Sequence, residues 1–126
     1  MGNPLAISPS RETPWHFTTG DFVAAILRRW PDAEIRLHDA DDDSVALSFG
    51  LPSRAGHPLL CSLSADGRAV WISGSTIAEG AEIAAWVRGL VPGEQELVFY
   101  DQAYSFDVAV GPGMTAAQIE AAVPDG

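Results

Sequence analysis

The chain has 126 residues and a mass of 13.3 kDa, the size of one ordinary globular domain. Seven basic residues against 17 acidic ones give a formal net charge of -10. This charge argues against nucleic acid as a ligand, because phosphate contacts need lysine or arginine. The longest uninterrupted apolar run, at 22–27, is far shorter than the roughly 20 residues that cross a bilayer. We therefore expect a soluble protein with neither nucleic acid nor membrane as a partner.

The single cysteine, Cys61, and the first residues of the chain bear on the compartment. One cysteine cannot form an internal disulfide, so the chain needs no oxidising environment in which to fold. The N-terminus has neither the basic start nor the apolar run of a secretory signal. These features predict a cytoplasmic protein.

The chain is predicted to consist of an arm and one domain. Residues 1–16 contain Pro4, Pro9 and Pro14 without an apolar period, which predicts an irregular N-terminal arm. Residues 17–126 carry alternating helix-like and strand-like patterns and are predicted to form a single α+β domain.

The first helix is predicted from the N-cap Thr18 to Trp30, because apolar side chains recur on one helical face and Pro31 ends the pattern. Phe17 can pack on Phe22 as a hydrophobic staple in front of this helix. This contact would fix the angle at which the chain enters the helix.

Four strands follow, because apolar and polar residues alternate along the next part of the chain. These strands are predicted at 34–38, 45–49, 59–63 and 69–72. Asp66 and Gly67 join the last two, and this dipeptide suits a two-residue type I′ turn. Pairing outward from the turn sets three pairs of residues opposite each other: Leu63 and Val70, Cys61 and Ile72, and Ser62 and Trp71. Trp71 is therefore predicted to lie on the less apolar face of the sheet.

Two helices and a hairpin complete the predicted fold. The second helix begins at a capping box, Thr76 and Glu79, and closes near Gly89. A hairpin follows with strands at 97–100 and 104–110, whose register the sequence leaves open, and a short helix begins at a second capping box, Thr115 and Gln118. The predicted order is α-β-β-β-β-α-β-β-α, an α+β fold with a single antiparallel sheet of five to six strands.

An acidic run between two predicted strands is the first candidate site, and it contains Asp39, Asp41, Asp42 and Asp43. The alternate aspartates are similar to the start of a calcium-binding loop, but Ser44 and Gly50 stand where such a loop needs glycine and a bidentate glutamate. We therefore predict no metal site. The run is predicted to be a solvated hairpin loop that can attract a basic protein.

Two aromatic residues, Trp71 and Tyr100, are the second candidate site. Both are predicted on the sheet face opposite the helices, with Leu60 and Val98 nearby. If uncovered, these side chains form an apolar patch with carboxylates at its rim, which is typical of a protein-binding surface. The alternative is a second packed layer, covered by the N-terminal arm and the third helix.

No catalytic residue and no cofactor are predicted. The chain lacks the Gly-x-Ser-x-Gly, His-Glu-x-x-His and Walker signatures of common catalytic and nucleotide sites. Cys61 alternates with Leu59 and Leu63 on the predicted core face, where a thiol is inert. It is therefore not expected to act as a nucleophile with His57 as its base.

Two resemblances bear on function. The order of helices and strands over residues 18–123 resembles the small α+β fold of type III secretion chaperones. The segment Ile83-Ala84-Ala85-Trp86-Val87-Arg88, followed by Leu97-Val98-Phe99-Tyr100-Asp101 and by Met114-Thr115, is similar to small acidic immunity proteins that neutralise bacterial toxins. Either resemblance implies a bacterial binding protein whose acidic face meets a basic partner, often as a dimer.

The leading hypothesis is a non-catalytic protein-binding module, immunity- or chaperone-like, that presents an acidic surface to a basic protein partner. Its expected binding residues are Asp39, Asp41, Asp42, Asp43, Trp71 and Tyr100. One alternative is a small-molecule-binding domain or an enzyme with a pocket between the sheet and the helices. Another is a homodimeric structural or regulatory module joined through a sheet face or edge.

Overall fold

The computed structural model describes residues 4–9, 16–37, 45–51, 59–73, 76–101, 103 and 106–123. The helices in these segments are α1 (Thr19–Arg29), α2 (Ile77–Leu90) and α3 (Ala116–Ala122). The strands in these segments are β1 (Leu5–Pro9), β2 (Glu34–Leu37), β3 (Val45–Leu51), β4 (Leu59–Ser64), β5 (Val70–Ser73), β6 (Leu97–Asp101) and β7 (Asp107–Val110).

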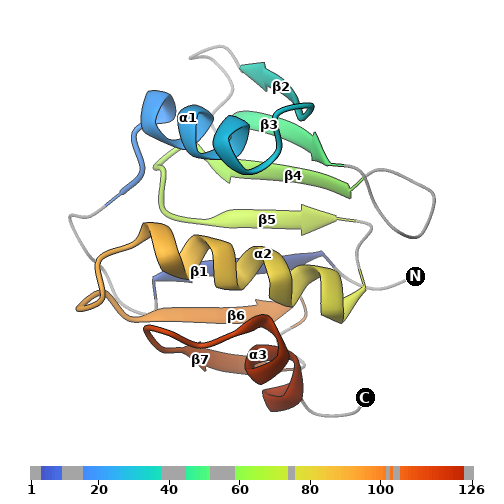
Figure 1. Ribbon diagram of the computed structural model, residues 1–126, viewed down its shortest axis with the longest axis vertical. Coiled ribbons are helices and arrows are strands. Elements are labelled where there is room, and N and C mark those ends of the chain that lie inside the picture. The colour runs from blue at the N-terminus through green and yellow to red at the C-terminus, as the bar shows by residue number, and fades with distance from the viewer. Residues whose placement is uncertain are drawn as a thin grey trace.

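The described strands form one antiparallel sheet in the order β2-β3-β4-β5-β1-β6-β7. Figure 1 shows all three helices on one face of this sheet, with α1 at the end that contains β2, α2 across the middle and α3 beside β7. The fold is α+β with a single antiparallel sheet, as predicted. The sheet has seven strands rather than five to six, and the chain begins with a strand rather than a helix.

The additional strand, β1, lies in the segment predicted to be an irregular arm. It is inserted between β5 and β6, and its first three residues, Leu5, Ala6 and Ile7, are buried. Pro9 pairs with β6 alone, beyond the last residue that pairs with β5, so the proline does not interrupt a doubly paired part of the strand. The prediction of irregular structure is therefore wrong for residues 5–9. The sequence does not reveal this strand, because the apolar stretch between Pro4 and Pro9 is too short to show the alternating pattern of a strand.

The hydrophobic core lies between the helices and the sheet. Alternate residues of the strands point into it, among them Ile7, Phe49, Leu63, Val70, Ile72 and Phe99. Aromatic rings join the two layers, because Phe22 of α1 lies 5.7 Å from Phe49 of β3 and 5.6 Å from Trp86 of α2, measured between ring centroids. The core therefore lies on one face of the sheet.

The helices begin where the sequence predicts. Thr18 caps α1 by accepting a hydrogen bond from an amide of the first turn, and the ring centroids of Phe17 and Phe22 lie 4.7 Å apart, as expected for a hydrophobic staple. Both predicted capping boxes are present, at Thr76 of α2 and Thr115 of α3. Local sequence therefore determines these starts.

The hairpin of β4 and β5 has the predicted register but a different turn. The three predicted pairs, Leu63 and Val70, Cys61 and Ile72, and Ser62 and Trp71, are all observed. The Gly67 N–H donates to the Ser64 carbonyl oxygen at 2.9 Å, so Ala65 and Asp66 are the central residues, one position earlier than predicted. The reason is the Asp66 carboxylate, which accepts from the Ser64 hydroxyl at 2.5 Å and the Arg68 N–H at 3.0 Å.

Candidate functional site

The face of the sheet opposite the helices, here called the open face, is the candidate functional site (Figure 1). One row of side chains crosses all seven described strands on this face: Arg36, Ser48, Ser62, Trp71, Ala6, Tyr100 and Asp107. These residues point away from the helices because most of their neighbours along the strands lie in the core, among them Ile7, Val70 and Phe99. The row has small residues and two aromatic rings in its middle and a charged residue at each edge.

Trp71 and Tyr100 are brought together on the open face by β1. Ala6 lies between them in the sheet, opposite Trp71 on one side and Tyr100 on the other. The ring centroids are 6.1 Å apart and the planes meet at 80°, an edge-on contact that aromatic pairs favour. Ser8 donates a hydrogen bond to the Tyr100 hydroxyl at 3.3 Å. The pair is therefore held by three adjacent strands.

Exposure differs among the apolar side chains of the open face. Leu60 is 61% exposed, Trp71 and Val98 are half-buried, and Tyr100 is only 9% exposed. The apolar surface is therefore centred on Leu60 and Trp71, and Tyr100 supports Trp71 from the side. The third helix does not cover these residues, because it packs on α2 on the helix side of the sheet (Figure 1).

The hairpin of β6 and β7 completes this face with a register that the sequence leaves open. Tyr100 lies opposite Asp107, and Val98 lies opposite Ala109. The second strand begins at Asp107, and the predicted earlier start at Tyr104 lies outside the described residues. An exposed carboxylate therefore lies beside the aromatic pair at this edge.

A groove of about 580 Å³ runs over the open face from β2 to β5. Its lining includes Glu34 and Arg36 of the edge strand, Leu60 and Ser62 of β4, and Ser73 of β5. A carboxylate and a guanidinium thus lie together at the β2 end of the groove, and hydroxyl groups and one large exposed leucine line the part over β4 and β5. A broad and shallow surface of this kind suits a protein side chain or loop better than an enclosed small ligand.

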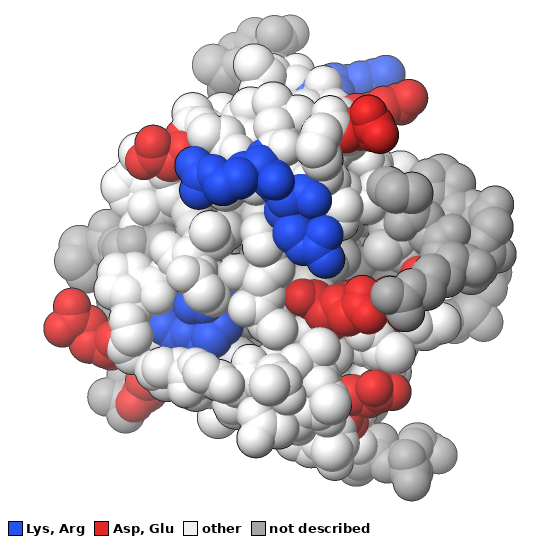
Figure 2. Space-filling view, in the orientation of Figure 1, with Lys and Arg blue, Asp and Glu red and all other residues white. Residues whose placement is uncertain are grey.

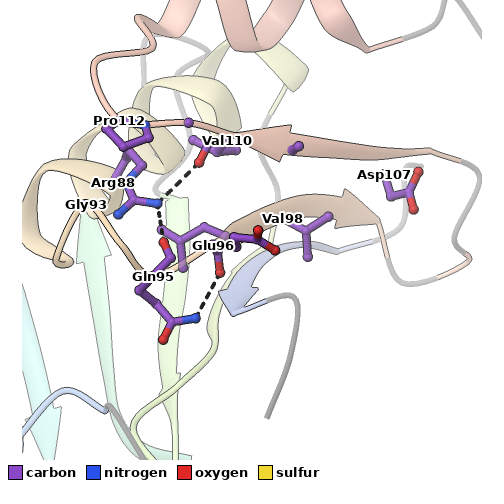
Figure 3. A pocket seen from close by; sticks show the side chains of 11 residues that line it. Arg88, Gly93, Gln95, Glu96, Val98, Asp107, Val110 and Pro112 are labelled. Atoms are coloured by element: carbon purple, nitrogen blue, oxygen red, sulfur yellow. Dashed lines mark hydrogen bonds between the residues drawn. The ribbon is translucent and has the colours of Figure 1, made fainter. Parts of the chain in front are cut away.

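A second hollow, of about 490 Å³, lies where β6 begins and β7 ends, and Figure 3 shows Arg88 among the residues that line it. Arg88 comes from α2 and is 4% exposed. Its two terminal nitrogens donate to four backbone carbonyl oxygens: Gln95 at 2.7 Å, Val110 at 3.3 Å, Val91 at 3.2 Å and Pro92 at 2.6 Å. These bonds use all four terminal N–H groups, so Arg88 holds the backbone, and only its buried Nε has no hydrogen-bond partner among the described residues.

Sequence reasoning does not predict the role of Arg88. Burial lowers the pKa of its guanidinium, which nevertheless stays charged because an arginine starts from a very high value. One feature of the sequence could have indicated this role: the spacing of Arg88 from Ala81 and Ala84 places an arginine on the buried face of α2. A buried cation at the carboxyl end of a helix also interacts favourably with the helix dipole.

The acidic residues predicted to bind a partner, Asp39, Asp41, Asp42 and Asp43, lie outside the described residues. The strands on either side of them, β2 and β3, lie together at one end of the sheet. Figure 2 shows the helix side, where basic residues gather at α1 and acidic ones are spread around them. Within the described part of the chain, this side shows no continuous acidic surface.

Cys61 is buried at the core side of β4, as predicted, and burial raises the pKa of its thiol to about 12. The thiol is therefore neutral at physiological pH and is not a nucleophile. His57, considered and rejected above as a base for this thiol, lies outside the described residues. Among the described residues, no three histidine, cysteine, aspartate or glutamate side chains are grouped so that they could hold a metal ion.

This burial predicts slow chemical labelling of Cys61. The shift of the pKa from 9.0 to about 12 lowers the thiolate fraction at neutral pH about a thousandfold. We expect a maleimide or a disulfide reagent to react with the native protein only as fast as the chain opens, and to react rapidly in urea. Rapid labelling of the native protein at pH 7 would contradict the burial of this thiol.

Comparison of the chain with protein-family models, curated proteins and solved structures gave no significant match. No helix in the described segments is long and apolar enough to span a membrane.

Proposed function

We propose that the protein is a non-catalytic binding module that holds a basic protein partner on the open face of its sheet. The observation that carries this proposal is the apolar surface of Leu60 and Trp71, held on rigid central strands and supported by Tyr100. Large apolar and aromatic side chains at the centre of a flat surface supply most of the binding energy in protein interfaces. An immunity- or chaperone-like role in the cytoplasm is part of the proposal.

The charge of the molecule supports a basic partner. The net charge is -10, and on the open face the exposed carboxylates of Glu34 and Asp107, at its two edges, outnumber the guanidinium of Arg36 beside Glu34. Such a distribution attracts a positively charged protein before contact, and salt weakens this attraction. The affinity then depends on the central apolar residues, and the association rate depends on the charges.

A pocket between the sheet and the helices, the runner-up, has less support. The cavity that Trp30, Leu59 and Ile83 line between the helices and the sheet has a volume of only about 70 Å³, whereas the groove on the open face has about 580 Å³. We therefore place the partner on the sheet surface.

Two matched variants test the proposal. Leu60→Asp and Leu27→Asp each place a carboxylate at an exposed leucine, but Leu60 lies on the open face and Leu27, at 43% exposure, lies on α1. We expect a basic protein to be retained from native lysate by the wild type and by Leu27→Asp at low salt, and to bind Leu60→Asp at least about tenfold more weakly. A partner that is lost with Leu27→Asp and retained by Leu60→Asp would overturn the proposal.

A separate prediction concerns the acidic run. Replacing Asp41, Asp42 and Asp43 together with asparagine is expected to slow association with the partner severalfold at low salt and to leave the dissociation rate unchanged. Stopped-flow or surface-based kinetics at two salt concentrations measure both rates. An unchanged association rate at low salt would show that these aspartates serve solubility alone.

A further inference from the structure

Strand β2 is one edge of the sheet and pairs with β3 on one side only among the described strands. Figure 1 shows it at the end of the sheet farthest from β7. The outer backbone groups of an edge strand can pair with a further strand. Leu37, at the end of β2, is 64% exposed, more than the other large apolar side chains of the described residues. The edge therefore combines available backbone groups with an exposed apolar side chain.

Symmetry restricts how two copies of this edge can pair. When identical strands pair antiparallel in one continuous sheet, the two-fold axis is perpendicular to the sheet and one residue lies opposite its own copy. The residue at this position can be Glu34, Ile35, Arg36 or Leu37. Each choice fixes every other pair, so the sequence of β2 discriminates among the four registers.

Charge complementarity favours the register centred on Ile35. In this register Glu34 of each copy lies opposite Arg36 of the other, so two pairs of opposite charge form. Glu34 and Arg36 both lie on the open face, opposite Gly50 and Ser48 of β3, and both are exposed. Registers centred on Glu34 or on Arg36 place like charges opposite each other, and a register centred on Leu37 places no carboxylate opposite Arg36.

The apolar residues of β2 fit the same register. Ile35 and Leu37 lie on the helix side, opposite the buried Phe49 and Leu47 of β3. With Ile35 on the axis, the two isoleucines meet each other and Leu37 of each copy meets Ala33 of the other. The exposed leucine is therefore covered by a small apolar residue.

We propose that two copies of this chain pair through β2 in this register and form a symmetric dimer with one continuous sheet. Because the axis is perpendicular to the sheet, both helix layers lie on one side and both open faces lie on the other. The dimer thus presents two adjacent copies of the groove that Glu34 and Arg36 help to line. This inference is independent of the proposed function and holds whatever the open face binds.

Charge reversal at two positions tests the register. Sedimentation equilibrium of the wild type is expected to show a species of twice the chain mass of 13.3 kDa. Glu34→Arg and Arg36→Glu each turn two attractive pairs into two repulsive ones, and each is expected to weaken the dimer by about tenfold or more. The double variant Glu34→Arg with Arg36→Glu restores both attractive pairs and is expected to restore the dimer.

Three results would overturn the proposal: a wild type that stays monomeric at every concentration, single variants that dimerise as well as the wild type, or a double variant as weak as the singles. Thermal unfolding of each variant, at a dilution where all are monomeric, separates lost pairing from lost folding. We expect all variants to unfold at similar temperatures, because both side chains are exposed and their replacement leaves the core intact.

Discussion

Replacing Arg88 with methionine is expected to lower the free energy of unfolding by about 3 to 5 kcal/mol. Methionine keeps much of the aliphatic volume but removes the donors from four backbone carbonyl oxygens. Three of these oxygens belong to the connection after α2, and the fourth belongs to Val110 at the end of β7. The loss therefore affects a helix, a loop and an edge strand together.

Urea unfolding of matched variants measures this effect. Arg68→Met is the control, because Arg68 is only half-buried and its ion pair with Asp66, at 3.5 Å, is expected to contribute less than about 1 kcal/mol. Arg88→Lys is expected to fall between the wild type and Arg88→Met, since an ammonium group has three donors in a different geometry. Equal losses for Arg88→Met and Arg68→Met would contradict the role assigned to the buried guanidinium.

The second large effect is expected at Gly67, where replacement by alanine is predicted to cost about 2 to 4 kcal/mol. The φ angle of Gly67 is 74°, in the left-handed region that favours glycine. An added Cβ would also collide with the backbone oxygen of Phe17, whose N–H donates to the Gly67 carbonyl oxygen at 2.8 Å. The substitution would therefore displace the segment that leads into α1.

Gly113→Ala is the matched control for this prediction. Gly113 has a similar φ of 81°, but a Cβ at this position would meet no atom within 4 Å. Its replacement carries the conformational cost alone, about 1 to 2 kcal/mol. The difference between the two variants in urea unfolding gives the cost of the collision at Gly67. If both variants lose the same stability, the close approach of the turn to Phe17 has no energetic consequence.

Local signals explain which parts of the fold the sequence predicts. The caps at Thr18, Thr76 and Thr115 act within one helical turn, and the register of β4 and β5 follows from a short loop, so neighbouring residues suffice for both. Strand β1 is different, because its partners lie far along the chain: Ala6 pairs with Trp71 and Tyr100. No short-range pattern reveals such a pairing.

The candidate site, too, has features that the sequence predicts and features that it does not. The period of two places Trp71 and Tyr100 on one face of the sheet, because that assignment needs only alternation along each strand. Their contact needs Ala6 between them, and the sequence does not reveal the strand that supplies it. The role of Arg88 also escapes sequence reasoning, because its acceptors are carbonyl oxygens that every residue possesses.

Side-chain oxidative footprinting of the protein, alone and with its captured partner, tests the open face most directly. Hydroxyl radicals modify exposed apolar and aromatic side chains, and Leu60, Trp71 and Leu27 report on both sides of the molecule. The proposed function predicts that the partner protects Leu60 and Trp71 and leaves the modification of Leu27 unchanged. Protection of Leu27 with unchanged modification of Leu60 and Trp71 would place the partner on the helices and contradict the central claim.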